Sequence, residues 1–177
     1  YAGITSPGNA PSALTVGAFD DKGTATRADD LVSPYSGRGP TWYDGLAKPD
    51  VLAPGHRMVS NTYRTETLYK NYPQFVVDSN HLRLSGTSMA SGVAAGAVAV
   101  LLEANRTANG YPARPSLTPN AVKALVQYTA IRMHDASGAE YDSLTQGGGA
   151  LNLAGAITVG QAIDTAAPVG AWWLLMG

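Results

Sequence analysis

Short apolar runs between turn residues mark the expected strands of this chain. Residues 13–18 (ALTVGA) and 51–55 (VLAPG) are apolar, include β-branched residues and lie between turn-forming residues, as is typical of buried strands. The chain between them, residues 20–48, is rich in Gly, Asp, Ser and Pro, which predicts a long surface connection with little regular structure. A polar stretch follows the second run, and within it residues 75–77 (FVV) predict a hairpin or an extended loop.

Longer segments have the length and composition of helices. Residues 88–104 carry Ala or Gly on nearly every side, which predicts a buried and closely packed helix. Thr118 before a proline is an N-cap followed by Pro at the first helical position, so a second helix should run to about residue 130. Residues 151–156 predict a short helix. The tail at residues 171–176 is apolar enough to need a surface on which to dock.

Composition indicates one compact domain or most of one. The chain has 177 residues, of which 45% are hydrophobic, so it can bury one sizeable core. The 12 Lys and Arg balance the 13 Asp and Glu, which argues against nucleic acid or an anionic membrane as the main partner. The longest apolar run, residues 93–102, is shorter than the roughly 20 residues of a membrane span. The chain begins at Tyr1 with no initiator methionine, so we expect that an upstream part has been removed.

The chain has no cysteine, so a nucleophile would have to be something other than a thiol, and Ser88 is the candidate. Ser88 lies where a strand-like segment gives way to the predicted helix. Backbone N–H groups in the first turn of a helix lack intrahelical partners, and the helix dipole favours negative charge there. Gly86 and Ala90 leave room for a bound carbonyl. From Gly-x-Ser-x-Ala alone, a serine that merely opens a buried helix remains the commoner interpretation.

Several ordered motifs strengthen the case for Ser88. Residues 86–91 (GTSMAS) resemble the nucleophile motif of the subtilisin-like serine proteases, the subtilase family. Further segments are similar to elements of that family in order and approximate spacing: residues 13–18, 35–40 (YSGRGP), 48–55 (KPDVLAPG), 117–125 and 147–152. One departure is Gly92, which stands where the family commonly has proline near the start of the helix. The resemblance covers about residues 1–160 and leaves residues 161–177 as an apolar C-terminal tail.

The resemblance implies a subtilisin-like α/β fold, with a mostly parallel sheet and flanking helices, of which this chain is the C-terminal half. It implies a serine endopeptidase in which Ser88 attacks a peptide carbonyl and the Ser88 backbone N–H is one oxyanion donor. It also implies that Thr5, Ser6 and Gly86 line the pocket for the substrate residue before the scissile bond. In subtilases the catalytic triad runs Asp, His, Ser along the chain. The acid, the base and a side-chain oxyanion donor are therefore expected in an N-terminal half that partners this chain, and the chain alone should be inactive.

The resemblance also implies a polypeptide substrate, secretion and no cofactor for the chemistry. It allows structural calcium, to which the loops at residues 8–13 and 20–30 could contribute, but their acidic residues have no diagnostic spacing, so the metal ligands stay unassigned. Asp50 is expected to form structural hydrogen bonds. Met89 is expected to pack beside the nucleophile.

Other functions remain open at this point. An internal base would have to be His81, expected in a strand or hairpin, or His56, expected to be solvated after the Pro-Gly turn. His134, with Asp135 beside it, fits the Ser, acid, His order of α/β-hydrolases poorly because no acid precedes it at a convincing spacing. The rival functions are a non-catalytic binding or structural module on the same scaffold, and an esterase that uses Ser88.

Overall fold

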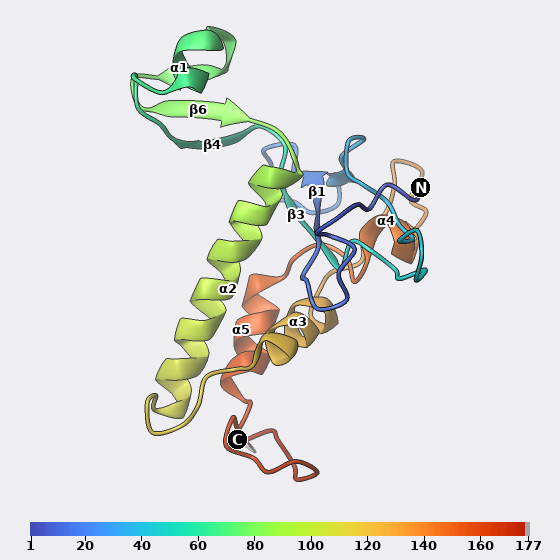
Figure 1. The fold of residues 1–177 in the computed structure, drawn as a ribbon, viewed down its shortest axis with the longest axis vertical. Coiled ribbons are helices and arrows are strands. Elements are labelled where there is room, and N and C mark those ends of the chain that lie inside the picture. The colour runs from blue at the N-terminus through green and yellow to red at the C-terminus, as the bar shows by residue number, and fades with distance from the viewer. Residues whose placement is uncertain (176–177) are drawn as a thin grey trace.

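The computed structural model describes residues 1–175, which form two small sheets and five α-helices (Figure 1). The first sheet has the strand order β2-β1-β3, from β1 (Val16–Asp20), β2 (Leu31–Val32) and β3 (Val51–Pro54). β1 pairs with β3 in parallel and with β2 antiparallel, and Leu52 adds a parallel bridge to Ala150. The predicted α/β class and both predicted strands are confirmed, with β1 beginning three residues later than the apolar run.

The connection between β1 and β3 is irregular, as predicted, but part of it is buried rather than on the surface. Ser33 and Ser36 are almost fully inaccessible. The Ser33 N–H donates to the Ala18 carbonyl (2.9 Å), and the Ser36 hydroxyl accepts from the Ala18 N–H (3.0 Å). These serines satisfy backbone groups of β1 that no strand covers, and a buried backbone group needs such a partner. Small polar residues can therefore be structural in the interior, which composition alone does not predict.

Helix α2 (Thr87–Asn109) is the longest element and packs against β1, β3 and α5. Its buried residues lie on one side: Ala90, Ala94, Ala97, Leu101, Asn105 and Asn109. The prediction of a helix buried all round was wrong, because the side that carries Gly92, Ala95, Gly96 and Ala99 is exposed. Small residues on both sides of a helix permit close packing, but they do not fix whether a neighbour occupies each side.

By length and composition alone, α2 could also cross a membrane. The expectation from residues 93–102 underestimated this, because Ala and Gly extend the apolar stretch in both directions. One side of α2 packs against the domain and 22% of its apolar stretch is buried, so length and composition are weak evidence for a membrane span. Asn105 is fully buried in this helix and donates from its side-chain amide to the Gly160 carbonyl (2.8 Å), which joins α2 to α5. Core helices of soluble proteins meet the same length and composition criteria.

The C-terminal helices are α3 (Pro119–Tyr128), α4 (Ser143–Gln146) and α5 (Leu153–Gln161). The predicted N-cap of α3 is confirmed, since the Thr118 hydroxyl accepts from the Ala121 N–H (3.2 Å). The predicted short helix begins two residues late, because Asn152 caps α5 by accepting from the Gly155 N–H (3.1 Å).

Residues 58–84 form a separate thin layer that we call the β4–β6 layer. It comprises β4 (Met58–Asn61), α1 (Thr67–Asn71), the 3₁₀ turn η1 (Pro73–Phe75), β5 (Val76–Asp78) and β6 (His81–Leu84). The strands are antiparallel in the order β4-β6-β5, so the predicted hairpin around residues 75–77 is confirmed. Figure 1 shows the layer projecting beyond the N-terminal end of α2. Within residues 58–84, Leu82 is the only buried residue, so the layer has almost no core of its own.

The C-terminal tail docks only in part. Leu174 forms a bridge with Ile163 and packs against the main core. Trp172 and Trp173 are 67% and 50% exposed, so the expected docking surface covers the backbone and Leu174 but not the indoles. Met176, which belongs to the predicted apolar tail, lies outside the described residues.

Candidate active site

Ser88 is the second residue of α2, and its side chain is exposed. Gly86 precedes the helix with φ 157° and ψ 162°, a backbone conformation that glycine alone adopts without strain. The Gly86 N–H donates to the Gly55 carbonyl (2.9 Å), which fastens the start of α2 to the end of β3. Within residues 1–175, the N–H groups of Thr87 and Ser88 have no hydrogen-bond acceptor. Two free donors therefore flank an exposed hydroxyl at a helix N-terminus.

A hollow of about 290 Å³ lies next to Thr87 and receives part of the predicted substrate pocket. Thr5 lines this hollow together with Tyr35 and Gly37 from the YSGRGP segment. Ser6 and Gly86, the other predicted pocket residues, are outside its lining. Thr5 and Ser6 are both exposed, and of the two only Thr5 lines the hollow beside Thr87.

A buried charge network holds residues 48–50, which immediately precede β3. Asp50 accepts from the Thr15 N–H (2.7 Å) and from the Lys48 ammonium (2.6 Å), and Lys123 lies 3.1 Å from its other oxygen. Both lysines also donate to the Ala13 carbonyl (2.8 and 2.9 Å). Lys48 and Asp50 are 2% and 3% exposed, and burial lowers the pKa of Lys48. Asp50 therefore ties residues 48–50 to β1, β3 and α3.

The role of Asp50 was expected from the sequence, whereas its lysine partners were missed. Lys48 belongs to the KPD segment, so its position beside Asp50 was available as a signal. Lys123 is 73 residues away from Asp50 in sequence and reaches it only because α3 packs over residues 48–50. No local pattern marks such a partner.

None of the histidines is joined to Ser88 by a hydrogen bond in the part of the chain that the structure describes. His81 lies at the end of β6 away from α2 and pairs with Asp78 (2.8 Å). His56 was expected to be solvated, and its side chain is 33% exposed, with its ring stacked on Tyr35 and its Nε2 4.0 Å from Asp20. His134 forms a backbone bridge with Glu140 in a surface turn. A base for Ser88 therefore has no candidate in direct contact with it among residues 1–175.

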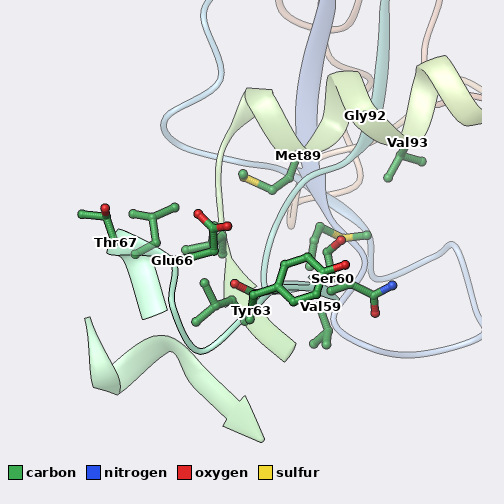
Figure 2. Close-up of a pocket in the computed structure, with 14 residues that line it drawn as sticks. Val59, Ser60, Tyr63, Glu66, Thr67, Met89, Gly92 and Val93 are labelled. Atoms are coloured by element: carbon green, nitrogen blue, oxygen red, sulfur yellow. The ribbon is translucent and has the colours of Figure 1, made fainter. Parts of the chain in front are cut away.

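Met89, next to Ser88 in sequence, lines a larger hollow that Ser88 does not line. Figure 2 shows Met89 and Val93 projecting from α2 toward Val59, Ser60 and Tyr63 of the β4–β6 layer. The space is about 750 Å³ and is mostly apolar. The predicted position of Met89 beside the nucleophile agrees with this geometry, and its thioether forms one wall of the hollow.

The described residues contain no group of three or more His, Asp or Glu side chains that could hold a metal ion. In the loop at residues 20–30, Asp20 is bound to Lys22 (2.7 Å) and Asp29 accepts from Thr24 (2.9 Å). These two carboxylates therefore have separate partners.

Comparison with known proteins gives matches over most of the chain. The model of the Subtilase family matches residues 2–156. Serine protease AprX of Bacillus subtilis (strain 168) is 41% identical over 124 residues, which are 70% of this chain and 26% of AprX. The minor extracellular protease Vpr of the same organism is 32% identical over 128 residues, covering 72% of this chain and 14% of Vpr.

Solved structures give the same result. The PatG macrocyclase in complex with peptide matches with a TM-score of 0.60 and 26% identity, over 88% of this chain and 38% of that chain. The matches confirm the subtilisin-like α/β fold that the motifs predict. The chain spans well under half the length of each of these proteins.

Proposed function

This chain belongs to the subtilase family, and we propose that it is the C-terminal part of a serine endopeptidase domain in which Ser88 is the nucleophile. The observation that carries the proposal is the exposed Ser88 hydroxyl at the start of α2, flanked by two backbone N–H groups without acceptors. An exposed nucleophile beside free donors is what acyl transfer requires.

In the proposed reaction, the Ser88 Oγ forms a bond to the peptide carbonyl carbon while its proton passes to a histidine base. The carbonyl oxygen becomes an oxyanion, and the Ser88 N–H donates to it. The C–N bond then breaks, and the base gives the proton to the leaving amine. Water hydrolyses the acyl-enzyme and restores Ser88. No cofactor takes part, and we assign no calcium ligands.

We propose that the base, the triad acid and a side-chain oxyanion donor come from an N-terminal half that docks on α2. The exposed side of α2 supports this, because Gly92, Ala95, Gly96 and Ala99 allow another backbone to approach closely. The absence of a base in contact with Ser88 among residues 1–175 supports it as well. The chain alone should then lack activity.

We further propose that the substrate is a polypeptide and that the protein is secreted. The name of Vpr describes it as extracellular, and the PatG structure is described as a complex with peptide. Both statements concern those relatives, and for this chain they are expectations that follow from family membership.

A fluorophosphonate that labels activated serines tests the proposal. We expect it to modify Ser88 in the longer protein, which includes the preceding segment, and to leave the 177-residue chain unlabelled. Ser88→Ala should abolish labelling and peptide cleavage, whereas Ser91→Ala, on the same helix turn, should retain both. The Ser91 hydroxyl donates to the Thr87 carbonyl (2.9 Å), so it is already engaged.

Two outcomes would favour the rival functions. A longer protein that is folded but is neither labelled nor active would favour a non-catalytic module. Cleavage of an ester without cleavage of the corresponding peptide would favour an esterase.

A further inference from the structure

Two arginines occupy one face of the β4–β6 layer. Arg57 immediately precedes β4 and Arg83 lies on β6, where it is paired with Val59. The pairs Val59–Arg83 and Met58–Leu84 fix the register, which places Arg57 opposite Ser85. Arg57 and Arg83 line the same two hollows, so the two residues lie on one face of the layer. Met58 lines the apolar hollow beside Met89, which neither arginine lines, whereas Leu84 lines both that hollow and one of the two that the arginines share.

The two guanidinium groups are uncompensated. Neither has a carboxylate or any hydrogen-bond acceptor within the described range, residues 1–175. Both residues line the same two hollows, so an anion bound there would meet two positive charges. Arg57 also has φ +55°, a conformation that non-glycine residues rarely adopt and that concentrates at functional sites.

Both arginines border two hollows. One, of about 620 Å³, has Phe75, Val76 and Val77 as an apolar wall and contains no acidic residue in its lining. The other, of about 370 Å³, also contains Asp20 and Asp21. Asp20 is paired with Lys22 (2.7 Å), whereas Asp21 accepts from the Gly23 N–H (3.0 Å) and keeps its negative charge, so this second hollow suits an anion less well. The first hollow therefore combines two free positive charges with an apolar wall.

This face is close to the candidate nucleophile. The Arg57 N–H donates to the Ser85 hydroxyl (2.9 Å), and Ser85 precedes Ser88 by three residues. Three residues of extended chain span at most about 11 Å, a distance that an extended substrate covers in about three residues. The arginines share no lining residue with the hollow that contains Thr5, and in Figure 1 the β4–β6 layer and the N-terminal segment lie on different sides of the start of α2.

We propose that Arg57 and Arg83 form a carboxylate subsite for the part of the substrate that follows the scissile bond. The inference rests on the proposed peptidase function and on the pocket at Thr5 taking the residue before that bond. A guanidinium binds a carboxylate through charge-assisted hydrogen bonds, and two of them side by side select an anion over its neutral amide. The carboxylate is supplied either by an Asp or Glu side chain or by the C-terminus of the substrate.

The test uses the longer protein and peptides that differ only by Glu or Gln at each of the first four positions after the scissile bond. A further pair ends at the third position as a free acid or an amide and distinguishes the C-terminal carboxylate from a side chain. We expect kcat/KM to favour the carboxylate by about tenfold or more in at least one arm. Arg83→Gln and Arg57→Gly should remove the preference, so that kcat/KM for the carboxylate peptide falls to that for the Gln or amide peptide. Glycine suits the positive φ of residue 57, so this variant removes the charge without added strain.

Arg64→Gln is the matched control, because Arg64 is an exposed arginine of the same layer outside both hollows. It should keep the preference. Equal cleavage of the paired peptides by the unmodified protein would overturn the subsite and leave the peptidase proposal intact. If no peptide is cleaved, fluorescence anisotropy measures the affinities of the same peptide pairs for the Ser88→Ala protein and so tests the subsite independently of catalysis. Tighter binding of the carboxylate form that Arg83→Gln removes would keep the subsite, and equal affinities would overturn it.

Discussion

Replacing Asp50 by Asn tests whether its ion pairs with Lys48 and Lys123 hold residues 48–50 in place. The substitution keeps the size of the side chain and removes its charge, which leaves Lys48 and Lys123 around a neutral amide. Lys48 is almost fully buried and 2.6 Å from the carboxylate, and Lys123 is 3.1 Å from it. Removing one partner of a buried ion pair costs about 3–5 kcal/mol, because the remaining charge stays desolvated without compensation.

Equilibrium urea unfolding of the protein at pH 7 measures this cost. At about 1.4 kcal/mol for each factor of ten, we expect Asp50→Asn to raise the unfolding constant by about two to three and a half orders of magnitude. Glu103→Gln, which neutralises an exposed carboxylate on α2, is the control and should change stability by less than about 0.5 kcal/mol.

A double substitution separates charge from shape. Asp50→Asn combined with Lys48→Met removes the more buried ammonium and should recover part of the loss, since an apolar replacement of a buried ion pair is often tolerated. A double variant no more stable than Asp50→Asn would refute the electrostatic explanation. A single variant within about 1 kcal/mol of the unmodified protein would refute it as well.

Two further predictions concern the segment at residues 142–149. Gly147 has φ +58°, and a Cβ there would collide with the Pro49 and Asp50 carbonyl oxygens, whereas Gly138 has φ +84° and open space around it. Gly147→Ala should therefore lose at least about 1 kcal/mol more stability than Gly138→Ala. Equal urea midpoints for the two variants would contradict this. The Tyr1 hydroxyl, 2.5 Å away, lowers the pKa of the Asp142 carboxyl below its ordinary value of 3.8. The ionised carboxylate therefore stabilises the folded state above that pH, and this stabilisation is lost as the pH falls through the lower pKa of the folded state. The difference in urea midpoint between the unmodified protein and Asp142→Asn should therefore be constant from about pH 7 to 5 and shrink below about pH 4, whereas a constant difference down to pH 3 would speak against the hydrogen bond.

Much of the fold could be predicted because its signals are local. The N-cap at Thr118 and the apolar run that becomes β3 each depend on neighbouring residues, and both are in the structure. The motif around Ser88 likewise specifies a turn that requires Gly86 and a helix that follows it.

The features that were missed depend on contacts between distant segments. The burial of Ser33 and Ser36 follows from unpaired groups of β1, and the position of Lys123 follows from the packing of α3. The exposed side of α2 could not be predicted either, since small residues suit a covered and an uncovered helix face equally. Arg57 and Arg83 are 26 positions apart and become neighbours only through the register of β4 and β6.

The hydrogen bond between Gly55 and Gly86 has a consequence for how such a protein can change. It joins the two ends of residues 56–85 at 2.9 Å, so whatever lies between them leaves and re-enters the body of the domain at one fixed point. Lengthening a loop whose ends are already held costs little free energy, about 0.6 kcal/mol for each doubling in length. Residues 56–85 can therefore vary in length and sequence, and new surfaces can be acquired beside Ser88 without altering the helix that presents it.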